Sequence, residues 1–431
     1  MDRLKAISSK LFKTGFFHIF GSNVINRAIL FLSSVILIRI LSKPDYGVYT
    51  YAWNIYSIII LLGGMGIESG VLQLASERNS DDRYVNNIFN YGTRFGLKYN
   101  IILFVLILGI GLFAPLKVER GRILLCMLCL FPEVQLLSNM TMNRLRAQKR
   151  NREYSNLNII NSVAMLALTA GLAVALREKG LVISGYLSGI LTVFLGWNLY
   201  HARILSRETP IIGEDRKPLL KISFISMCNN GLSQLMYLLD VFVLGIVDPQ
   251  ETILASYKVA TSIPTALTFI PTALITYIYP YFAEHRNDKA WCLEKYKKIL
   301  LGTGVMNAVI SGFLFLAAPL VVRILYGEQY LDAVPVFRIL AVNYFFSGTF
   351  RMISGNLLVT QRKLKFNFYV ALISSSINIV ADYFFIQWWG SVGAAMATVL
   401  VVLVSSIMST VYLVAVFRGK TEETSLEEGK S

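Results

Sequence analysis

Residues 391–417 read SVGAAMATVLVVLVSSIMSTVYLVAVF and contain no Asp, Glu, Lys or Arg. A helix of this length measures about 40 Å, which exceeds the ~30 Å of hydrocarbon in a bilayer. Runs of the same character recur along the chain. They fall at roughly 15–40, 47–75, 99–116, 122–143, 155–176, 181–201, 221–247, 255–282, 299–325, 333–359, 366–388 and 391–417. The pattern predicts an all-α integral membrane protein with about 12 transmembrane helices.

The composition agrees with a membrane protein and excludes a soluble one. The chain has 431 residues, of which 55% are hydrophobic and 16% are charged. Soluble domains have about 25% charged residues, because a polar surface must cover their core. The net charge of +15 would suggest a nucleic-acid partner in a soluble protein. Here the positive residues lie between the apolar runs, which indicates membrane topology and no nucleic-acid partner.

The distribution of Lys and Arg predicts the orientation. Of 41 such residues, 29 lie in segments that are cytoplasmic if the N-terminus is inside, and 8 lie on the opposite side. This asymmetry places both termini in the cytoplasm, with an even number of spans. The outer loops are about ten residues or shorter by this count. They leave no room for an outer catalytic domain, so the function is expected within the membrane.

The most polar inner loop divides the spans into two sets of six. The prediction is a basic interfacial helix at 1–14, an N-lobe at 15–205 and a cytoplasmic linker at 206–220, followed by a C-lobe at 221–417 and a disordered tail at 418–431. Because six is even, both lobes enter the membrane in the same direction. The tail is predicted to be disordered because it is polar and nearly free of apolar residues.

Charges within the spans are candidate functional residues, because each costs ~2.5–3.5 kcal/mol at the middle of a membrane helix. They are Arg27, Glu68, Glu133, Asp240, Lys258, Arg338, Arg351 and Asp382. Arg27 lies near the middle of the first span, where it is interpreted as an anion-binding group in a water-filled cavity. The alternative is a structural ion pair, for which Glu133 is the candidate partner. Glu68 and Arg351 lie in the inner third of their spans and form a second candidate ion pair.

A second group of polar residues is acidic and oxygen-rich. Asn378 and Asp382 are four residues apart and therefore share a helix face. Asp240, Asp382 and Thr398 all lie about 10 Å below the outer surface by helical rise. Oxygen ligands at one depth suit a hard cation such as Na⁺, or a carboxylate pair that shares a proton. The alternative is that these polar residues are unrelated and agree in depth by chance.

The chain shows no sequence motif for an enzyme. It has no phosphate-binding loop, and its three His residues have no clustered Ser or Cys beside them. We therefore expect a protein that is not an enzyme and has no cofactor, apart from a coupling ion, Na⁺ or H⁺.

Two stretches resemble a known family. GSNVINRAILFLSSVILIRILSKPDYGVYTYAWN (21–54) and GSVGAAMATVL (390–400) are similar to polysaccharide-repeat flippases of the Wzx O-antigen and teichuronic-acid exporter type. These belong to the MOP superfamily, with the lipid II flippase and the MATE drug exporters. The resemblance covers essentially the whole chain in length, number of spans and loop lengths.

The resemblance implies a V-shaped bundle of two six-helix lobes that rock to give alternating access. It implies a cargo of the undecaprenyl-pyrophosphate type, a lipid-linked oligosaccharide repeat unit flipped from the inner to the outer leaflet of the bacterial inner membrane. The other implied partners are membrane lipids and a polysaccharide polymerase or synthesis enzymes. A cationic cavity would bind the anionic headgroup through four residues, Arg27, Lys258, Arg338 and Arg351.

The resemblance also implies a sodium site, because spans seven, eleven and twelve of the lipid II flippase form one. The matching positions here are Asp240, Asn378, Asp382 and Thr398, with the Ala394 carbonyl as a further ligand. The lipid II flippase clusters several arginines in its first two spans. This chain has a single central Arg27 in the first and Glu68 in the second, so its cargo is expected to differ from lipid II.

Two other functions remain open. A MATE-like cation-coupled drug exporter would share the fold, but cationic drugs favour an acidic cavity, and this chain carries several Arg and Lys residues within its spans. A membrane-embedded polysaccharide polymerase or ligase would be expected to have substantial outer loops, which are missing here.

Overall fold

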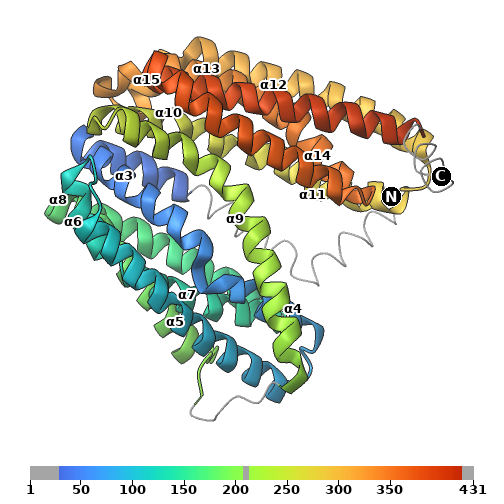
Figure 1. Cartoon of the computed structure of the whole chain (residues 1–431). Helices are drawn as coiled ribbons and strands as arrows, with labels where there is room; N and C mark the ends of the chain where they lie inside the picture. The colour runs from blue at the N-terminus through green and yellow to red at the C-terminus, as the bar shows by residue number, and fades with distance from the viewer. Residues whose placement is uncertain (1–28, 207–212, 420–431) are drawn as a thin grey trace. The chain divides into compact units, whose positions relative to one another are not determined.

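The computed structural model describes residues 29–206 and 213–419 (Figure 1). Within these ranges the chain is helical and forms no strand. A helix at Ile29–Ile40 comes first. It is followed by α3 (Lys43–Ile59), η1 (Ile60–Gly66), α4 (Ile67–Glu77), α5 (Asp82–Phe113), α6 (Glu119–Met127), α7 (Phe131–Ala147), α8 (Asn151–Asn198), η2 (Gly213–Asp215), α9 (Arg216–Val247), α10 (Glu251–Leu267), α11 (Phe269–Glu284), α12 (Lys289–Tyr326), η3 (Glu328–Ala333), α13 (Val334–Phe346), η4 (Ser347–Arg351), α14 (Met352–Thr360) and α15 (Leu364–Phe417).

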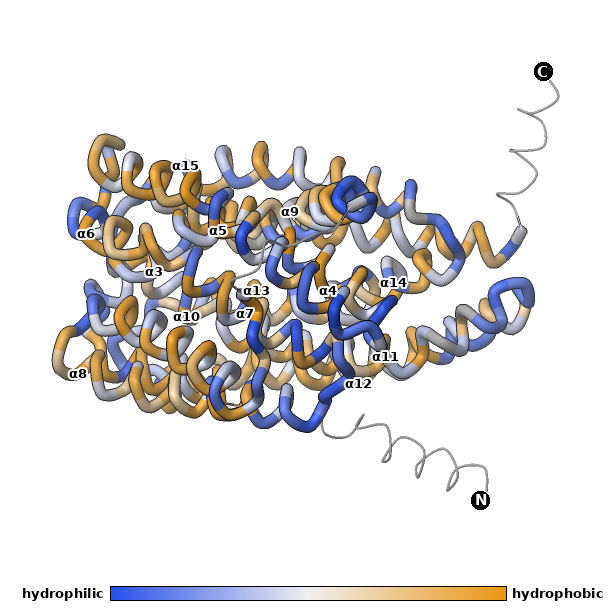
Figure 2. The backbone as a smooth tube through the Cα atoms, turned by 90° about the horizontal axis from the view of Figure 1, so that it is seen from below, coloured by the Kyte–Doolittle hydropathy of each residue, from blue (hydrophilic) through white to orange (hydrophobic). Residues whose placement is uncertain are grey.

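The described helices are those of a multi-pass membrane protein. Seven are long and apolar enough to cross a membrane, and an eighth span results if α6 and α7, bent by 46°, are taken as one. Figure 2 shows hydrophobic residues along most of the helices. Large apolar side chains such as Phe113, Leu301 and Leu316 are exposed on them, as lipid-facing residues would be. The predicted all-α membrane fold is thus confirmed.

The helix α8 consists of two antiparallel arms. Arg177 has φ 51° and ψ −133°, a conformation that reverses the chain direction. The hydroxyls of Thr169 and Ser184 lie 3.1 Å apart, although fifteen residues of straight helix would separate them by about 22 Å. The predicted spans at 155–176 and 181–201 correspond to the two arms.

The helix α15 reverses in the same way. Gly390 has φ 56° and ψ −133°, which a residue without Cβ adopts readily. The rings of Phe366 and Tyr412, near opposite ends of α15, stack with centroids 3.7 Å apart. At Gly393 a Cβ would lie 1.9 Å from the Phe385 carbonyl oxygen, so glycine allows the arms to approach closely. The count of twelve spans remains a prediction, because the first is described only from residue 29.

The second predicted span, 47–75, contains a break that the sequence analysis did not predict. The helix α3 ends before a glycine-rich stretch, in which Gly64 has φ 52° and Met65 has φ 53°. Broken backbone at membrane depth needs internal hydrogen-bond partners. Asn100 provides one, since its Oδ1 accepts from the Gly64 amide at 2.8 Å, and its Nδ2 is held by the Pro132 carbonyl of α7 at 3.1 Å.

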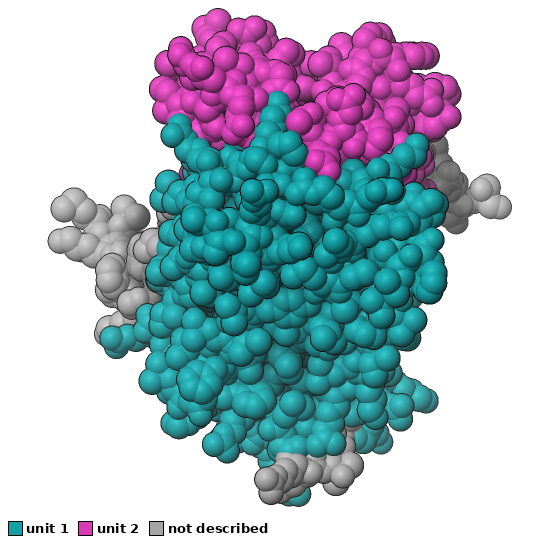
Figure 3. Space-filling view, turned by 90° about the vertical axis from the view of Figure 1, so that its left-hand side faces the viewer, with its two compact units in different colours: residues 1–238 teal, residues 239–431 magenta. Residues whose placement is uncertain are grey.

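The described chain divides into two compact units, with unit 1 ending at Leu238 and unit 2 beginning at Leu239 (Figure 3). The core of unit 1 comes mainly from α4, α5 and α7, and includes Val71, Phe89 and Met140. The core of unit 2 comes from α11, α12, α14 and α15. The predicted lobe and linker boundaries remain a prediction. The predicted interfacial helix at 1–14 and all but the first two residues of the predicted tail lie outside the described residues.

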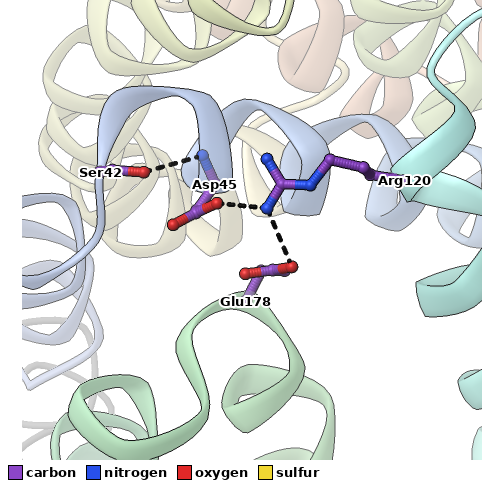
Figure 4. Close-up of polar contacts among 4 residues, drawn as sticks. All are labelled: Ser42, Asp45, Arg120 and Glu178. Carbon is purple, nitrogen blue, oxygen red and sulfur yellow. Dashed lines mark hydrogen bonds and ion pairs between the residues drawn. The ribbon is translucent and has the colours of Figure 1, made fainter.

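An ion-pair cluster ties three helix connections of unit 1 together (Figure 4). Ser42 caps α3 by accepting a hydrogen bond from the Asp45 amide at 3.3 Å. Arg120, in the first turn of α6, pairs with the carboxylate of Asp45 and, at 3.2 Å, with that of Glu178. Glu178 directly follows the turn at Arg177. On the predicted orientation all three connections lie on the outer side, so the cluster fastens that end of unit 1.

Candidate functional site

The strongest candidate site is a buried carboxylate cluster in unit 2. Asp240 comes from α9, while Asn378, Asp382 and Thr398 come from the two arms of α15. Asn378 and Asp382 share a face of the first arm, and the turn at Gly390 brings the second arm, with Thr398, back beside it. Asp240 is 7% exposed and Asp382 is fully buried. Residues that the sequence analysis grouped by depth are therefore brought together in space.

Asp240 is held by three donors. Its Oδ2 accepts from the Tyr257 hydroxyl at 2.8 Å and from Thr398 Oγ1 at 2.6 Å. Its Oδ1 accepts from Asn378 Nδ2 at 3.4 Å. These donors lower the cost of a negative charge on Asp240. The sequence analysis missed Tyr257, because one tyrosine among 22 carries no distinguishing signal.

Asp382 has the opposite environment. Both of its carboxylate oxygens are buried, and neither has a hydrogen-bond donor among the described residues; the same holds for Asn378 Oδ1. Asp382 lies one helical turn from Asn378, which bonds to Asp240, so an ionised Asp240 would repel a negative charge on Asp382. Acceptors left without a donor in a low-dielectric interior are costly. A bound proton or a small cation would remove that cost.

The fit to a sodium ion can be judged from the ligand atoms. Every candidate ligand is an oxygen, as hard cations require. Thr398 Oγ1 lies 3.0 Å from the Ala394 carbonyl and 2.6 Å from Asp240, but its single proton can serve only one of these acceptors at a time. One acceptor therefore stays available to a cation. The residues of the cluster, Asp240, Asn378, Asp382, Ala394 and Thr398, fit the predicted site.

Of the four predicted substrate-binding cations, Arg338 and Arg351 lie far apart. Arg27 lies outside the described residues. Lys258 is exposed on α10. Arg338 donates from Nε to the Phe315 carbonyl at 3.2 Å, with its guanidinium 5.5 Å from the centre of the Phe315 ring. Arg351, in η4, follows Arg338 by thirteen residues of one helical run, about 20 Å. One phosphate cannot contact both, and the substrate-binding role of the four remains a prediction.

The two remaining intramembrane acids lie in unit 1. Glu68 accepts hydrogen bonds from Asn139 Nδ2 at 3.2 and 3.1 Å, and it lines a cavity of about 400 Å³. Glu133 lies in the first turn of α7, and its Oε2 is buried with no donor among the described residues. Whether either acid pairs with an arginine, as the sequence analysis considered for Arg27 and Arg351, stays open.

Comparison with known families decides the class of the protein. The model of the family described as polysaccharide biosynthesis protein matches residues 36–335, more than half of the chain. The chain belongs to this family. An uncharacterized membrane protein in the cps region of Klebsiella pneumoniae is 23% identical over 401 residues, and the match covers 89% of this chain and 78% of that protein.

Solved structures show the fold of this polysaccharide biosynthesis protein. The lipid II flippase MurJ in an inward closed conformation matches with a TM-score of 0.71 and 16% identity, over 93% of this chain and 88% of that one. An inward-facing multidrug resistance MATE transporter of the MOP superfamily matches with a TM-score of 0.70 and 16% identity, over 91% and 96%. The predicted MOP-type fold is confirmed. The matched structures are those of a flippase and a transporter.

Proposed function

We propose that this protein is a flippase that moves a polyprenyl-pyrophosphate-linked oligosaccharide repeat unit from the inner to the outer leaflet of the bacterial inner membrane. Its membership of the polysaccharide biosynthesis family and its MOP-type fold support the reaction class. The relative in the cps region of Klebsiella pneumoniae supports a polysaccharide precursor as cargo. Both termini would be cytoplasmic, as the distribution of Lys and Arg predicts.

The observation that carries the coupling mechanism is the cluster of Asp240 and Asp382. Asp240 is held by donors from α10 and α15, whereas Asp382 has none among the described residues. A sodium ion or proton, when bound, supplies the positive charge that lowers the repulsion between these carboxylates. Because the two lie on α9 and α15, gain or loss of the ion changes how tightly these helices pack. This would link the ion gradient to alternating access.

The anionic end of the cargo would meet the intramembrane cations. Arg27 and Lys258 are the proposed pyrophosphate-facing residues, since charge-assisted hydrogen bonds to phosphate are strong. The distance of about 20 Å between Arg338 and Arg351 means that these two would contact different parts of the cargo, or the cargo at different stages.

A second candidate is a MATE-like, cation-coupled drug exporter. The observation in its favour is that a MATE structure matches this fold as well as the flippase does, with TM-scores of 0.70 and 0.71. A buried carboxylate cluster would serve cation coupling in either function. Cargo transport, rather than cation binding, must therefore distinguish the two.

Complementation of export tests the proposal. A bacterium without its own repeat-unit flippase receives this gene and the matching synthesis genes, and its surface polysaccharide and inner-leaflet lipid-linked units are measured. Wild type is compared with Asp382→Asn and with Asp248→Asn, which makes the same change at the loop end of α9. We expect wild type and Asp248→Asn to export, and Asp382→Asn to accumulate lipid-linked units inside.

The outcomes separate the parts of the proposal. If wild type restores no export while every synthesis step is confirmed, the flippase function is overturned and the drug exporter becomes the favoured function. Export by Asp382→Asn at the wild-type rate and protein level would leave the flippase in place but remove the carboxylate cluster from the mechanism.

A further inference from the structure

Unit 1 contains a polar cavity that the coupling mechanism does not use. Its volume is about 400 Å³, within the range of about 300–1,000 Å³ for small-molecule pockets. It lies between α4, α7 and α8, and its lining includes four Asn, two Ser, one Glu, one Arg and one Tyr. With one acid and one base, the lining has no net charge. Such a lining suits neither a pyrophosphate nor a hydrophobic cation.

One wall of the cavity presents acceptors in a fixed position. Asn139 Nδ2 donates to both carboxylate oxygens of Glu68, at 3.2 and 3.1 Å. These bonds hold the carboxylate in place from the neighbouring helix α7. Each carboxylate oxygen can accept a further hydrogen bond, since an ionised carboxyl has about four acceptor positions. A neighbouring pair of hydroxyls is a matching ligand.

A second wall presents donors. Asn161 Oδ1 accepts a hydrogen bond from Ser188 Oγ at 2.6 Å, from the second arm of α8. Thr192 Oγ1, on the same arm, lies 2.8 Å from Asn161 Oδ1 and 2.9 Å from the Ser188 carbonyl, so its single proton serves one of these acceptors at a time. With its carbonyl oxygen bonded to Ser188, Asn161 can offer its amide NH₂ to a ligand. The second arm of α8 thus orients the Asn161 amide, which lies on the first arm.

An aromatic ring and a guanidinium complete the lining. The Arg146 guanidinium lies 5.7 Å from the centre of the Tyr154 ring, and its Nη1 donates to Asn143 Oδ1 at 3.4 Å. An aromatic ring offers a flat apolar face beside these polar groups. Arg146 also lies in the predicted cytoplasmic segment 144–153, so the cavity lies towards the side from which a cytoplasmic precursor arrives.

From these contacts we infer that the cavity binds a neutral sugar ring of the lipid-linked oligosaccharide, an inference that rests on the proposed function. Sugar hydroxyls donate and accept together, so they need the mixture of carboxylate, amide and hydroxyl groups that lines this cavity. The apolar C–H face of the sugar packs against Tyr154. The cavity recognises the saccharide, whereas the cations recognise the pyrophosphate.

Direct binding of free sugars tests the inference without requiring transport. The full-length protein is reconstituted in lipid nanodiscs, because glucoside and maltoside detergents carry competing sugar headgroups. Saturation-transfer NMR, which detects weak binding, is recorded with maltose and N,N′-diacetylchitobiose as probes, and with inorganic pyrophosphate as the competitor. We expect saturation transfer to at least one neutral disaccharide, without displacement by pyrophosphate.

Variants locate the binding in the cavity. Glu68→Gln and Asn161→Ala are expected to weaken disaccharide binding at least fivefold, and Tyr154→Ala gives an independent test if either fails to fold. Asn198→Ala is the matched control. Asn198 is the last residue of α8, and its side chain donates to the Phe194 carbonyl of that helix. Each variant is first checked for an unchanged thermal unfolding midpoint.

The results distinguish this inference from the flippase itself. Restored export with no disaccharide binding, or with wild-type binding in all three cavity variants, would overturn the sugar site and leave the flippase standing. Displacement by pyrophosphate would overturn it in favour of an anion site. Disaccharide binding in the cavity of a protein that restores no export would keep the saccharide site and overturn the flippase.

Discussion

Replacing Asp382 by Asn removes one charge from the buried cluster while keeping the shape of the side chain. In wild type, Asp382 is fully buried and has no donor among the described residues, and it lies one helical turn from Asn378, which bonds to Asp240. Two unit charges 4 Å apart repel by ~4 kcal/mol at an effective dielectric constant of 20. Wild type with neither a cation nor a proton at the cluster carries a cost of this order, and Asp382→Asn does not.

Cation binding should recover a similar amount. A ligand present at about 100 times its dissociation constant stabilises the folded state by ~2.7 kcal/mol. We therefore expect saturating sodium chloride, compared with choline chloride at equal ionic strength, to raise the unfolding midpoint of wild type by a few degrees in nanodiscs. Asp382→Asn should begin near the raised value and respond little. Asp248→Asn, outside the cluster, should behave as wild type.

The matching change at Asp240 separates charge from hydrogen bonding. Asp240→Asn also removes one charge, but it weakens the bonds from Tyr257 and Thr398, which costs about 1–3 kcal/mol when a buried donor loses its partner. It should be less stable than Asp382→Asn and equally unresponsive to sodium. An unchanged sodium response in Asp382→Asn, or a wild type that responds to neither sodium nor acidification, would refute the reasoning and leave a purely structural cluster.

Three further predictions concern packing, each measured by thermal unfolding in nanodiscs. Arg120→Ala should cost about 2 kcal/mol, because it leaves the carboxylates of Asp45 and Glu178 without their cation. The cost is below that of a fully buried pair, since Arg120 is 46% exposed. Gly393→Leu should cost about 3 kcal/mol or prevent folding, since its Cβ would meet the Phe385 carbonyl; Gly312→Ala, in open space, is its control. Asn307→Leu should cost about 2 kcal/mol because two buried hydroxyls lose their partner, and an unchanged midpoint would contradict this.

Long apolar runs made most of the fold predictable from the sequence. Hydropathy decides which segments can lie in lipid. Long apolar segments there become helices, because a helix pairs its backbone hydrogen-bonding groups within itself. The turn at Gly390 falls between the predicted spans 366–388 and 391–417. The break at Gly64 was not foreseen, because it depends on Asn100, a residue of the next helix that bonds the interrupted backbone. Partners distant in sequence cannot be read from a hydropathy pattern.

From helical rise alone, only the depth of the candidate site's residues in the membrane was predictable. Counting 1.5 Å of rise per residue placed Asp240, Asp382 and Thr398 at one level, and the structure brings Asp240 and Thr398 into contact. Depth says nothing of helix rotation, which is why Tyr257 was missed. The same limit applies to Arg338 and Arg351, whose separation follows from their places on one helical run.

The two proposed binding sites divide the chemistry of the cargo cycle between the units. The sugar cavity uses residues of unit 1 alone, and the carboxylate cluster uses residues of unit 2 alone. Sodium and saccharide therefore do not compete for the same side chains. Any effect of one on the other must pass through a change in conformation, and linkage requires it to be reciprocal. If sodium changes the affinity for a sugar, the sugar must change the affinity for sodium by the same factor, and that factor measures how strongly the ion drives the cargo.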